Sequence, residues 1–172
     1  MKAVIKTERL LWVSFTVDLI KAAMAGRNEL AAKLGYHVAE DWPQRDFEDI
    51  FPFLLRQREE NPESSGWSGL VIHQTAGTLI GDAGFKGVPD RGEVEIGYSI
   101  VPAYQGNGYA TEITKALTEL GLNQPGVERI TADCLKDNTA SIRVLEKSGF
   151  YRAKEAEDLI YWKMEAGSNS AR

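Results

Sequence analysis

The chain has 172 residues, of which 43% are hydrophobic and 26% are charged, a composition typical of one globular domain with a single core. Its formal net charge of -5 at pH 7 argues against a nucleic-acid partner, because binding to phosphate backbones depends on clustered Lys and Arg. No apolar run approaches the ~18 residues of a membrane span, and the charged run at 6–9 excludes a signal peptide, so we expect a cytoplasmic protein without a membrane partner.

The first half of the chain predicts a strand, two helical stretches and a hairpin of two strands. These elements cover residues 9–15, 18–34, 46–60, 67–73 and 78–85. Gly35 is a plausible stop for the first helical stretch, and Pro52 must start, kink or split the second.

The second half begins with the clearest alternation in the chain, at 93–101. Its apolar face carries Val94, Ile96, Tyr98 and Ile100, and its polar face carries Glu93, Glu95, Gly97 and Ser99. The elements that follow are a helix ending near Gly121, a strand at 129–135, a helix at 138–148 and strands at 150–154 and 159–165.

This order of elements predicts an α+β (mixed α/β) fold. We expect a central mixed, mostly antiparallel sheet of six to seven strands flanked by helices, with parallel pairing where a helix crosses over. Residues 1–166 are predicted to form a single domain, and the polar tail 167–172 is predicted to be disordered.

Cysteine and histidine are scarce. The single cysteine, Cys134, excludes an intrachain disulfide, and it has no metal-ligand spacing to His37 or His73, so we predict no metal. Because no histidine lies near Cys134 in the sequence to activate it, a buried structural thiol is favoured over a covalent acetyl-enzyme.

A glycine-rich loop with the sequence Gln-Gly-Asn-Gly-Tyr-Ala, at 105–110, joins the strand at 93–101 directly to a helix. Glycines let the backbone turn tightly with converging N–H groups, and the helix start adds unpaired donors and a partial positive charge, which together suit a pyrophosphate. The loop lacks the Gly-Lys-Ser/Thr of a P-loop and the third glycine of a dinucleotide fingerprint. On spacing alone, a plain turn is as good an interpretation of this loop as a phosphate site. The absence of a Walker-type Ser/Thr arrangement argues against an ATP-binding protein.

Three segments resemble the GNAT superfamily of acetyltransferases. The loop at 105–110 fits the Gln/Arg-x-x-Gly-x-Gly/Ala acyl-CoA signature of that family, and 137–150 is similar to its later motif, in which an Asn opens a helix ending in Gly-Phe. The opening Thr-Glu-Arg-Leu at 7–10 resembles the first strand of the branch that contains ribosomal-protein N-terminal acetyltransferases. The chain departs from many relatives at Gln105 and Asn107, where they carry basic residues, so it has less side-chain charge for the phosphates.

The resemblance implies transfer of an acetyl group from acetyl-CoA to a primary amine, without a metal, by direct attack in a ternary complex. The resemblance implies that the amine belongs to a small molecule or a protein N-terminus, and we expect a monomer or a homodimer. By the same resemblance, the cofactor is bound by Ile100 and Val101 at the pantetheine, by Gln105, Gly106, Asn107, Gly108, Tyr109, Ala110 and Thr111 at the pyrophosphate, and by Asn138 near the thioester.

The chemistry requires a base, because an alkyl or N-terminal amine is mostly ammonium at neutral pH, with a reference pKa of ~7.7 to 8 for an α-amine and ~10.4 for lysine. Glu95 is the best candidate, since it lies on the polar face upstream of the cofactor loop; the alternative is a solvated strand face, as for Glu93. Ser141, one helical turn after Asn138, is the candidate for protonating the thiolate, although serine is common in a first helical turn for structural reasons.

Two further points stay open. Tyr109 is a possible second helper, or a packing residue. Trp42 lies between the two helical stretches expected to form the acceptor pocket, whereas tryptophans more often pack a core. The alternative function is a non-catalytic CoA-binding sensor or regulatory module with a GNAT fold; the presence of Glu95 favours an enzyme.

Overall fold

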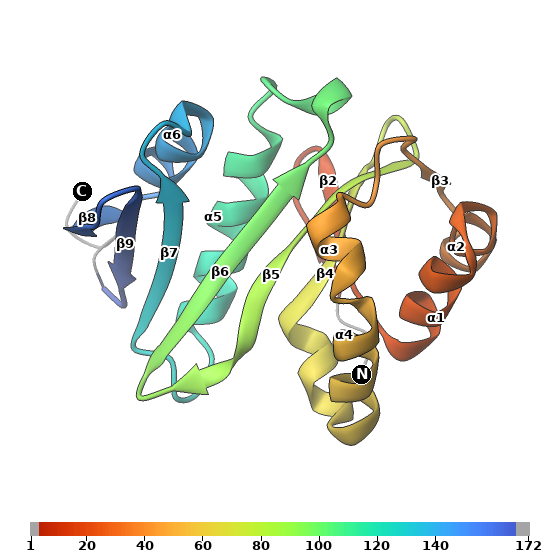
Figure 1. The fold of residues 1–172 in the computed structure, drawn as a ribbon, viewed down its shortest axis with the longest axis horizontal. Coiled ribbons are helices and arrows are strands. Elements are labelled where there is room, and N and C mark those ends of the chain that lie inside the picture. Colours follow the sequence, from red (N-terminus) through yellow and green to blue (C-terminus); the bar gives the residue numbers. More distant parts are fainter. Residues whose placement is uncertain (1–3, 168–172) are drawn as a thin grey trace.

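The computed structural model describes residues 4–167, which build one sheet flanked by helices (Figure 1). Within these residues the strands are β1 (Val4–Lys6), β2 (Leu10–Ser14), β3 (His37–Val38), β4 (Ser68–His73), β5 (Thr78–Asp90), β6 (Glu93–Ile100), β7 (Arg129–Leu135), β8 (Tyr151–Glu155) and β9 (Leu159–Glu165). The α-helices are α1 (Val17–Ala25), α2 (Arg27–Leu34), α3 (Arg45–Asp49), α4 (Phe51–Glu60), α5 (Tyr109–Leu122) and α6 (Thr139–Lys147), and short 3-10 helices cover Pro62–Trp67 and Pro102–Tyr104.

The strand order is β1-β2-β4-β5-β6-β7-β9-β8, with β3 beside β5. Neighbours pair antiparallel except β3 with β5 and β6 with β7, which pair parallel. The predicted mixed, mostly antiparallel fold is confirmed. The sheet has nine strands in the described residues instead of six to seven, because β1 and β3 have three and two residues and are too short to show a period.

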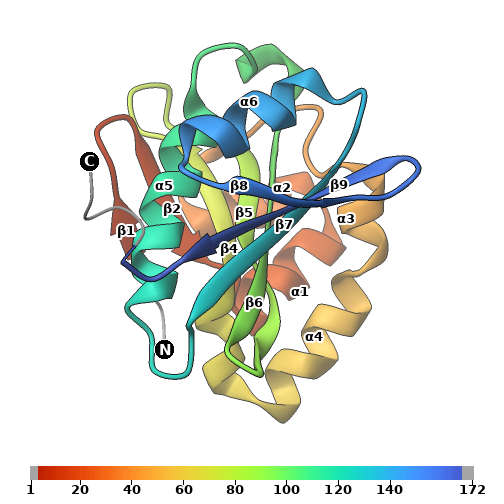
Figure 2. The same ribbon diagram turned by 90° about the vertical axis from the view of Figure 1, so that its left-hand side faces the viewer.

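The helices cover both faces of the sheet. In Figure 1, α5 passes behind β6, while α3 and α4 lie in front of the sheet. In Figure 2 the edge formed by β7, β9 and β8 faces the viewer, with α6 above it. The gaps between helices and sheet are filled by one core cluster that includes Trp12, Phe15, Ile80 and Trp162.

The prediction of one helix over 18–34 is wrong. The segment forms α1 and α2, which are separated at Gly26. Gly26 has φ 144° and ψ 172°, a backbone conformation that residues with a side chain rarely adopt, so the helix stops there and restarts. The other expected break is confirmed, because α3 ends before Ile50 and Pro52 lies in the first turn of α4.

An aromatic cluster fixes α3 and α4 against the sheet. Phe15 follows β2, Phe47 and Phe51 come from the two helices, and Trp42 comes from the segment before them; their ring centroids lie 5.2 to 6.3 Å apart. Phe15, Trp42 and Phe51 are buried. Each such pair contributes about 0.5 to 1.5 kcal/mol beyond its burial, so the cluster gives this helical wall a defined position.

Two predictions concern the ends of the chain. The tail at 167–172 lies outside the described residues except for Gly167, which lies in a turn, and the single domain over 1–166 stays a prediction. Within residues 4–167, no helix combines the length and the apolar character that crossing a membrane requires.

Candidate active site

β6 and β7 diverge. They pair only at Glu93 with Arg129, Val94 with Ile130 and Glu95 with Thr131. Beyond this point β6 stays paired with β5 as far as Ile100, and β7 stays paired with β9 as far as Leu135. The carboxyl halves of the two parallel strands therefore separate within an otherwise continuous sheet, and α6 lies near the carboxyl end of β7 (Figure 1).

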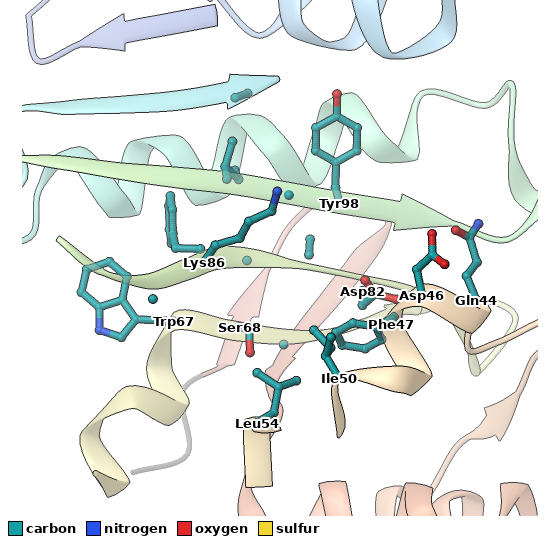
Figure 3. Close-up of a pocket in the computed structure, with 18 of the residues that line it drawn as sticks. Gln44, Asp46, Phe47, Ile50, Leu54, Trp67, Ser68, Asp82, Lys86 and Tyr98 are labelled. Atoms are coloured by element: carbon teal, nitrogen blue, oxygen red, sulfur yellow. The ribbon is translucent and has the colours of Figure 1, made fainter. Parts of the chain in front are cut away.

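A cavity of about 720 Å³ extends from this opening to the wall formed by α3 and α4 (Figure 3). Its lining includes the apolar side chains Phe47, Ile50 and Leu54 of the wall, Asp82 and Lys86 of β5, Tyr98 of β6, Cys134 of β7, and Asn138 and Ser141 of α6. The structure therefore brings the predicted residues Asn138 and Ser141 to one cavity with α3 and α4, the second of the two helical stretches expected to form the acceptor pocket, whereas α1 and α2 contribute no lining residue.

A pair of hydroxyl groups lies at the α6 end of the cavity. The Oη atom of Tyr98 lies 2.8 Å from Oγ of Ser141, and the side chain of Asn138 accepts a hydrogen bond from the backbone N–H of Ser141 as the cap of α6. Burial raises the pKa of Tyr98 to about 12. Tyr98 is therefore protonated at neutral pH, and the pair can donate a proton to a group in the opening. Sequence reasoning placed Tyr98 on the apolar face and missed it.

The glycine loop has the backbone shape of an anion site. Gly106 and Gly108 have φ 79° and 83°, and a Cβ atom at Gly106 would meet nothing within 4 Å, so conformation and not crowding requires glycine there. Gly108 caps α5 without any side-chain hydrogen bond to the helix. The N–H of Glu112 donates to the carbonyl of Gly108 at 3.0 Å, and the N–H groups that precede it in the first turn of α5 are left for an external acceptor such as phosphate.

The polar side chains of the loop hold its shape. Nε2 of Gln105 donates to the carbonyl of Ile100 at 2.8 Å, and Nδ2 of Asn107 donates to the carbonyl of Tyr104 at 3.2 Å. Neither side chain carries charge. Contacts of Ala110 and Thr111 with phosphate, like those of the loop, stay predictions.

Arg9 supplies the charge that the loop lacks. Its Nη1 donates to the carbonyl of Asn107 at 2.9 Å, and its guanidinium lies 4.5 Å from the centre of the Tyr109 ring. Nε of Arg9 binds Glu112 at 2.7 Å. Burial opposes the charge of Glu112, but hydrogen bonds from Thr7 and Arg9 hold its pKa below the ordinary value. Sequence reasoning missed this cation, because 98 residues separate it from the loop.

Tyr109 is engaged away from the cavity. Its hydroxyl lies 2.8 Å from Nε2 of His73, and its ring packs edge to face on His73 and beneath Arg9. Tyr109 is not among the residues that line the cavity. These contacts indicate a packing residue of the loop.

Backbone groups at the end of β6 are divided between the sheet and the opening. The N–H of Val101 donates to the carbonyl of Ile80 at 2.8 Å, and its carbonyl accepts from Tyr104 at 3.0 Å. Because successive residues of a strand direct their backbone groups to opposite edges, the N–H of Ile100 points to the open edge. Pantetheine contacts of Ile100 and Val101 stay predictions, and both backbone groups of Val101 already have partners.

Glu95 lies on the predicted face but has a cationic partner. Its carboxylate lies 2.5 Å from Nζ of Lys86, and its side chain is 34% exposed. Lys86 lines the cavity, whereas Glu95 does not. Glu93 pairs with Arg129 at 2.8 Å, and this hydrogen bond holds the pKa of Glu93 below its ordinary value. The role of Glu95 as the base stays a prediction.

Asp82 is a carboxylate that sequence reasoning missed. It lies in the middle of β5, is 9% exposed and lines the cavity. Its Oδ2 accepts a hydrogen bond from Nε1 of Trp42 at 3.0 Å. Burial raises the pKa of Asp82 to about 7, and the Trp42 hydrogen bond partly offsets this effect. The available signal was an acidic residue inside the otherwise apolar, glycine-rich run at 79–85.

The remaining reactive groups are the thiol of Cys134 and side chains that could bind a metal. Cys134 is buried, and its sulfur accepts a hydrogen bond from Nε1 of Trp162 at 3.3 Å. Between residues 4 and 167, no three His, Cys, Asp or Glu side chains are grouped so that they would hold a metal ion.

Residues 16–151 match the model of the family described as acetyltransferase (GNAT) domain. The uncharacterized N-acetyltransferase YjdG of Bacillus subtilis (strain 168) is 29% identical over 160 residues, which cover 92% of this chain and 95% of YjdG. The crystal structure of ribosomal-protein-S5-alanine acetyltransferase from Vibrio fischeri has a TM-score of 0.70 at 19% identity and covers 95% of this chain and 96% of its own. RimL, a ribosomal L7/L12 alpha-N-protein acetyltransferase solved in complex with coenzyme A, has a TM-score of 0.63 at 18% identity. The match covers 95% of this chain and 98% of the RimL chain.

Proposed function

The chain belongs to the GNAT acetyltransferase family, and we propose that it transfers the acetyl group of acetyl-CoA to a primary amine by direct attack in a ternary complex. The observation that carries this proposal is the divergence of β6 from β7 beyond Glu95, beside the glycine loop and above a cavity of about 720 Å³. An extended thioester arm fits such an opening, because an unpaired strand edge offers N–H and C=O groups to an amide-bearing chain.

The donor side combines the loop, the opening and the start of α6. The pyrophosphate binds the N–H groups of the loop from Gly106 to Thr111, with the charge of Arg9 behind the backbone. The pantetheine lies along the open edge at Ile100, and Asn138 contacts the cofactor near the thioester. The bound coenzyme A in the RimL structure supports this role for the shared fold.

The acceptor side is the wall of α3 and α4. Phe47, Ile50 and Leu54 present apolar surface to the cavity, and Asp46 and Asp82 add two carboxyl groups on that side. This combination favours an acceptor that joins an ammonium group to an apolar body, either as a small molecule or as a protein N-terminus. A cytoplasmic location and a monomeric or homodimeric state stay predictions.

The transfer step uses the groups at the α6 end of the cavity. The hydroxyl pair of Tyr98 and Ser141 protonates the departing thiolate, directly or through water. Direct transfer is favoured over an acetyl-cysteine, because the sulfur of Cys134 is buried beside the indole of Trp162, and no histidine is among its hydrogen-bond partners within residues 4–167.

The proposed function is tested by a thiol-release screen that offers acetyl-CoA with a panel of amines and peptides. Release of free coenzyme A that depends on an amine is expected. Titration calorimetry, run with and without EDTA, measures acetyl-CoA binding separately, and we expect the same affinity in both. Tight binding with no thiol release for any amine would instead identify a CoA-binding module without turnover.

A further inference from the structure

We propose that Asp82 is the general base that takes the proton from the acceptor ammonium, and that Trp42 positions its carboxylate. This inference rests on the proposed acetyltransferase function and names a residue that the sequence pattern did not single out. It follows from the place of Asp82 in the cavity, its burial and the single hydrogen bond that it accepts.

The position of Asp82 relates it to both substrates. It lies on β5 opposite Ser99 of β6, the strand whose other edge is open to the thioester arm. Its side chain lines the same cavity as Asp46 and Phe47 of α3 (Figure 3), and its hydrogen-bond donor Trp42 packs against Phe47. An amine that approaches the opening from the α3 and α4 wall therefore passes Asp82.

The carboxylate has one occupied oxygen and one free oxygen. Oδ2 accepts the hydrogen bond from Nε1 of Trp42 at 3.0 Å, and Oδ1 has no hydrogen-bond partner in residues 4–167. Trp42 is itself held by edge-to-face contacts with Phe15 and Phe47. A rigid donor thus fixes one oxygen and leaves the other for an ammonium or a water molecule.

The surrounding charges leave Asp82 without a cation. The charged side chains that line the same cavity are Asp46 of α3, Arg58 of α4, Lys86 of β5 and Asp133 of β7. Nζ of Lys86 pairs with Glu95 of β6, and Arg58 donates to Ser64, Ser68 and the carbonyl of Phe15. No ion pair involves Asp82 among the described residues, so an acceptor ammonium would be its first cationic neighbour.

The environment matches the proton affinity that the reaction needs. Burial raises the pKa of Asp82 to about 7, close to the pH at which a general base works best. By contrast, Glu95 is 34% exposed and already paired with Lys86, and it does not line the cavity. Of the two carboxylates, Asp82 is the one that can both accept the proton and contact the acceptor.

An N–H bond of the ammonium breaks and its proton passes to Asp82, which frees the nitrogen lone pair to attack the thioester carbonyl carbon. The tetrahedral intermediate then collapses as the C–S bond breaks, and a proton from the nitrogen reaches the thiolate by way of the Tyr98 and Ser141 hydroxyls or water. The products are the acetylated amine and coenzyme A, and the proton on Asp82 returns to solvent.

The first experiment compares pH-rate profiles with phenethylamine as the probe acceptor. Asp82→Asn should lower kcat/KM at neutral pH by ~10² to 10⁴ and remove the rise in rate centred near pH 7, while the affinity for acetyl-CoA stays unchanged. Asn keeps an oxygen that accepts from Trp42, so the fold is preserved. Asp90→Asn, the same change at the exposed end of β5, is the matched control and should keep the parental profile.

Trp42→Phe separates positioning from packing. The phenyl ring retains most of the aromatic contacts, but it cannot donate to Asp82. Since the Trp42 hydrogen bond lowers the pKa of Asp82, its loss should move the rise in rate to higher pH without abolishing activity. If Trp42 only packs the fold, Trp42→Phe should lower the rate at every pH without moving the midpoint of the pH-rate profile.

A second measurement needs no acceptor. Carbon-13 NMR of aspartate carboxyl groups, with Asp82→Asn to assign the signal, should give a titration midpoint near pH 7. A midpoint below about pH 5, in the range of ordinary aspartates, would overturn the proposal. So would an active wild type whose rate rise survives in Asp82→Asn and disappears in Glu95→Gln. A wild type that releases no thiol with any amine would instead refute the acetyltransferase function.

Discussion

Arg9 and Glu112 are 103 residues apart in the sequence, and Nε of Arg9 lies 2.7 Å from Oε2 of Glu112. The backbone N–H of Arg9 binds the same carboxylate at 2.8 Å, and Nη1 of Arg9 binds the carbonyl of Asn107. The residue just before β2 is therefore tied both to the glycine loop and to the first turn of α5. The contact holds a cation directly behind the proposed phosphate site.

This contact predicts a selective loss of donor affinity. Arg9→Gln should weaken acetyl-CoA binding by about tenfold, equivalent to ~1.4 kcal/mol, because the loop loses both a positive charge and a tether. Titration calorimetry measures the change. Lys21→Gln, which removes the cation of the exposed Lys21 and Glu59 pair, is the control and should bind acetyl-CoA normally. Equal affinity in Arg9→Gln and wild type would show that Arg9 only braces the fold.

The backbone of the loop gives a sharper test. Gly108→Val should abolish acetyl-CoA binding, because φ 83° strains a β-branched residue and its Cβ would lie 3.4 Å from Nη2 of Arg9, so both the loop backbone and its cation would shift. Gly126→Val introduces the same residue at φ 82° in the turn before β7, away from the loop. Gly126→Val should lose about as much stability as Gly108→Val but bind acetyl-CoA with parental affinity. Parental affinity in Gly108→Val would remove the loop from the donor site.

The Tyr98 and Ser141 pair predicts a defect in turnover without a defect in donor binding. Tyr98→Phe and Ser141→Ala should each lower kcat by ~10², and the double variant should be little worse than either, because the two hydroxyls act through one hydrogen bond. Steady-state kinetics and calorimetry separate the two effects. Additive losses in the double variant would contradict a shared proton path.

Asp82 also predicts how stability depends on pH. Its pKa is about 7 in the folded protein against 3.8 for an ordinary aspartate, so folding favours the protonated form. This stability is fully present below about pH 4 and is lost as the pH rises to 7, by an amount on the order of 4 kcal/mol. Asp82→Asn should therefore gain free energy of unfolding relative to wild type as the pH rises. Urea unfolding at about pH 4 and about pH 8 measures the difference. A constant difference between the two proteins would show that Asp82 titrates normally.

Local patterns in the sequence were enough for most of the fold. The alternation from Val94 to Ile100 identified β6, and glycine and the cap at Asn138 identified the starts of α5 and α6. The break at Gly26 was missed, because apolar spacing continues across it and only the backbone angle ends the helix.

The candidate site could be proposed from the sequence where its chemistry is local, but not where it depends on distant contacts. The glycine loop and Ser141 were proposed from neighbouring residues, and their roles stay predictions. Arg9 acts on a loop 98 residues away, and Asp82 meets Trp42 across 40 residues. The pKa of a carboxylate in an apolar strand depends on its burial, which the sequence alone does not show. Periodicity therefore could not favour Asp82 over Glu95 as a candidate base.

The indole of Trp42 belongs both to the aromatic cluster behind α3 and α4 and to the hydrogen bond on Asp82. With the roles proposed above, the choice of acceptor and the pKa of Asp82 are coupled through one side chain. A natural or engineered change at Phe47 that reshapes the wall for a bulkier amine would also tilt the indole and change the pH at which the enzyme works. Relatives that diverge in acceptor range at this wall should accordingly diverge in pH optimum as well.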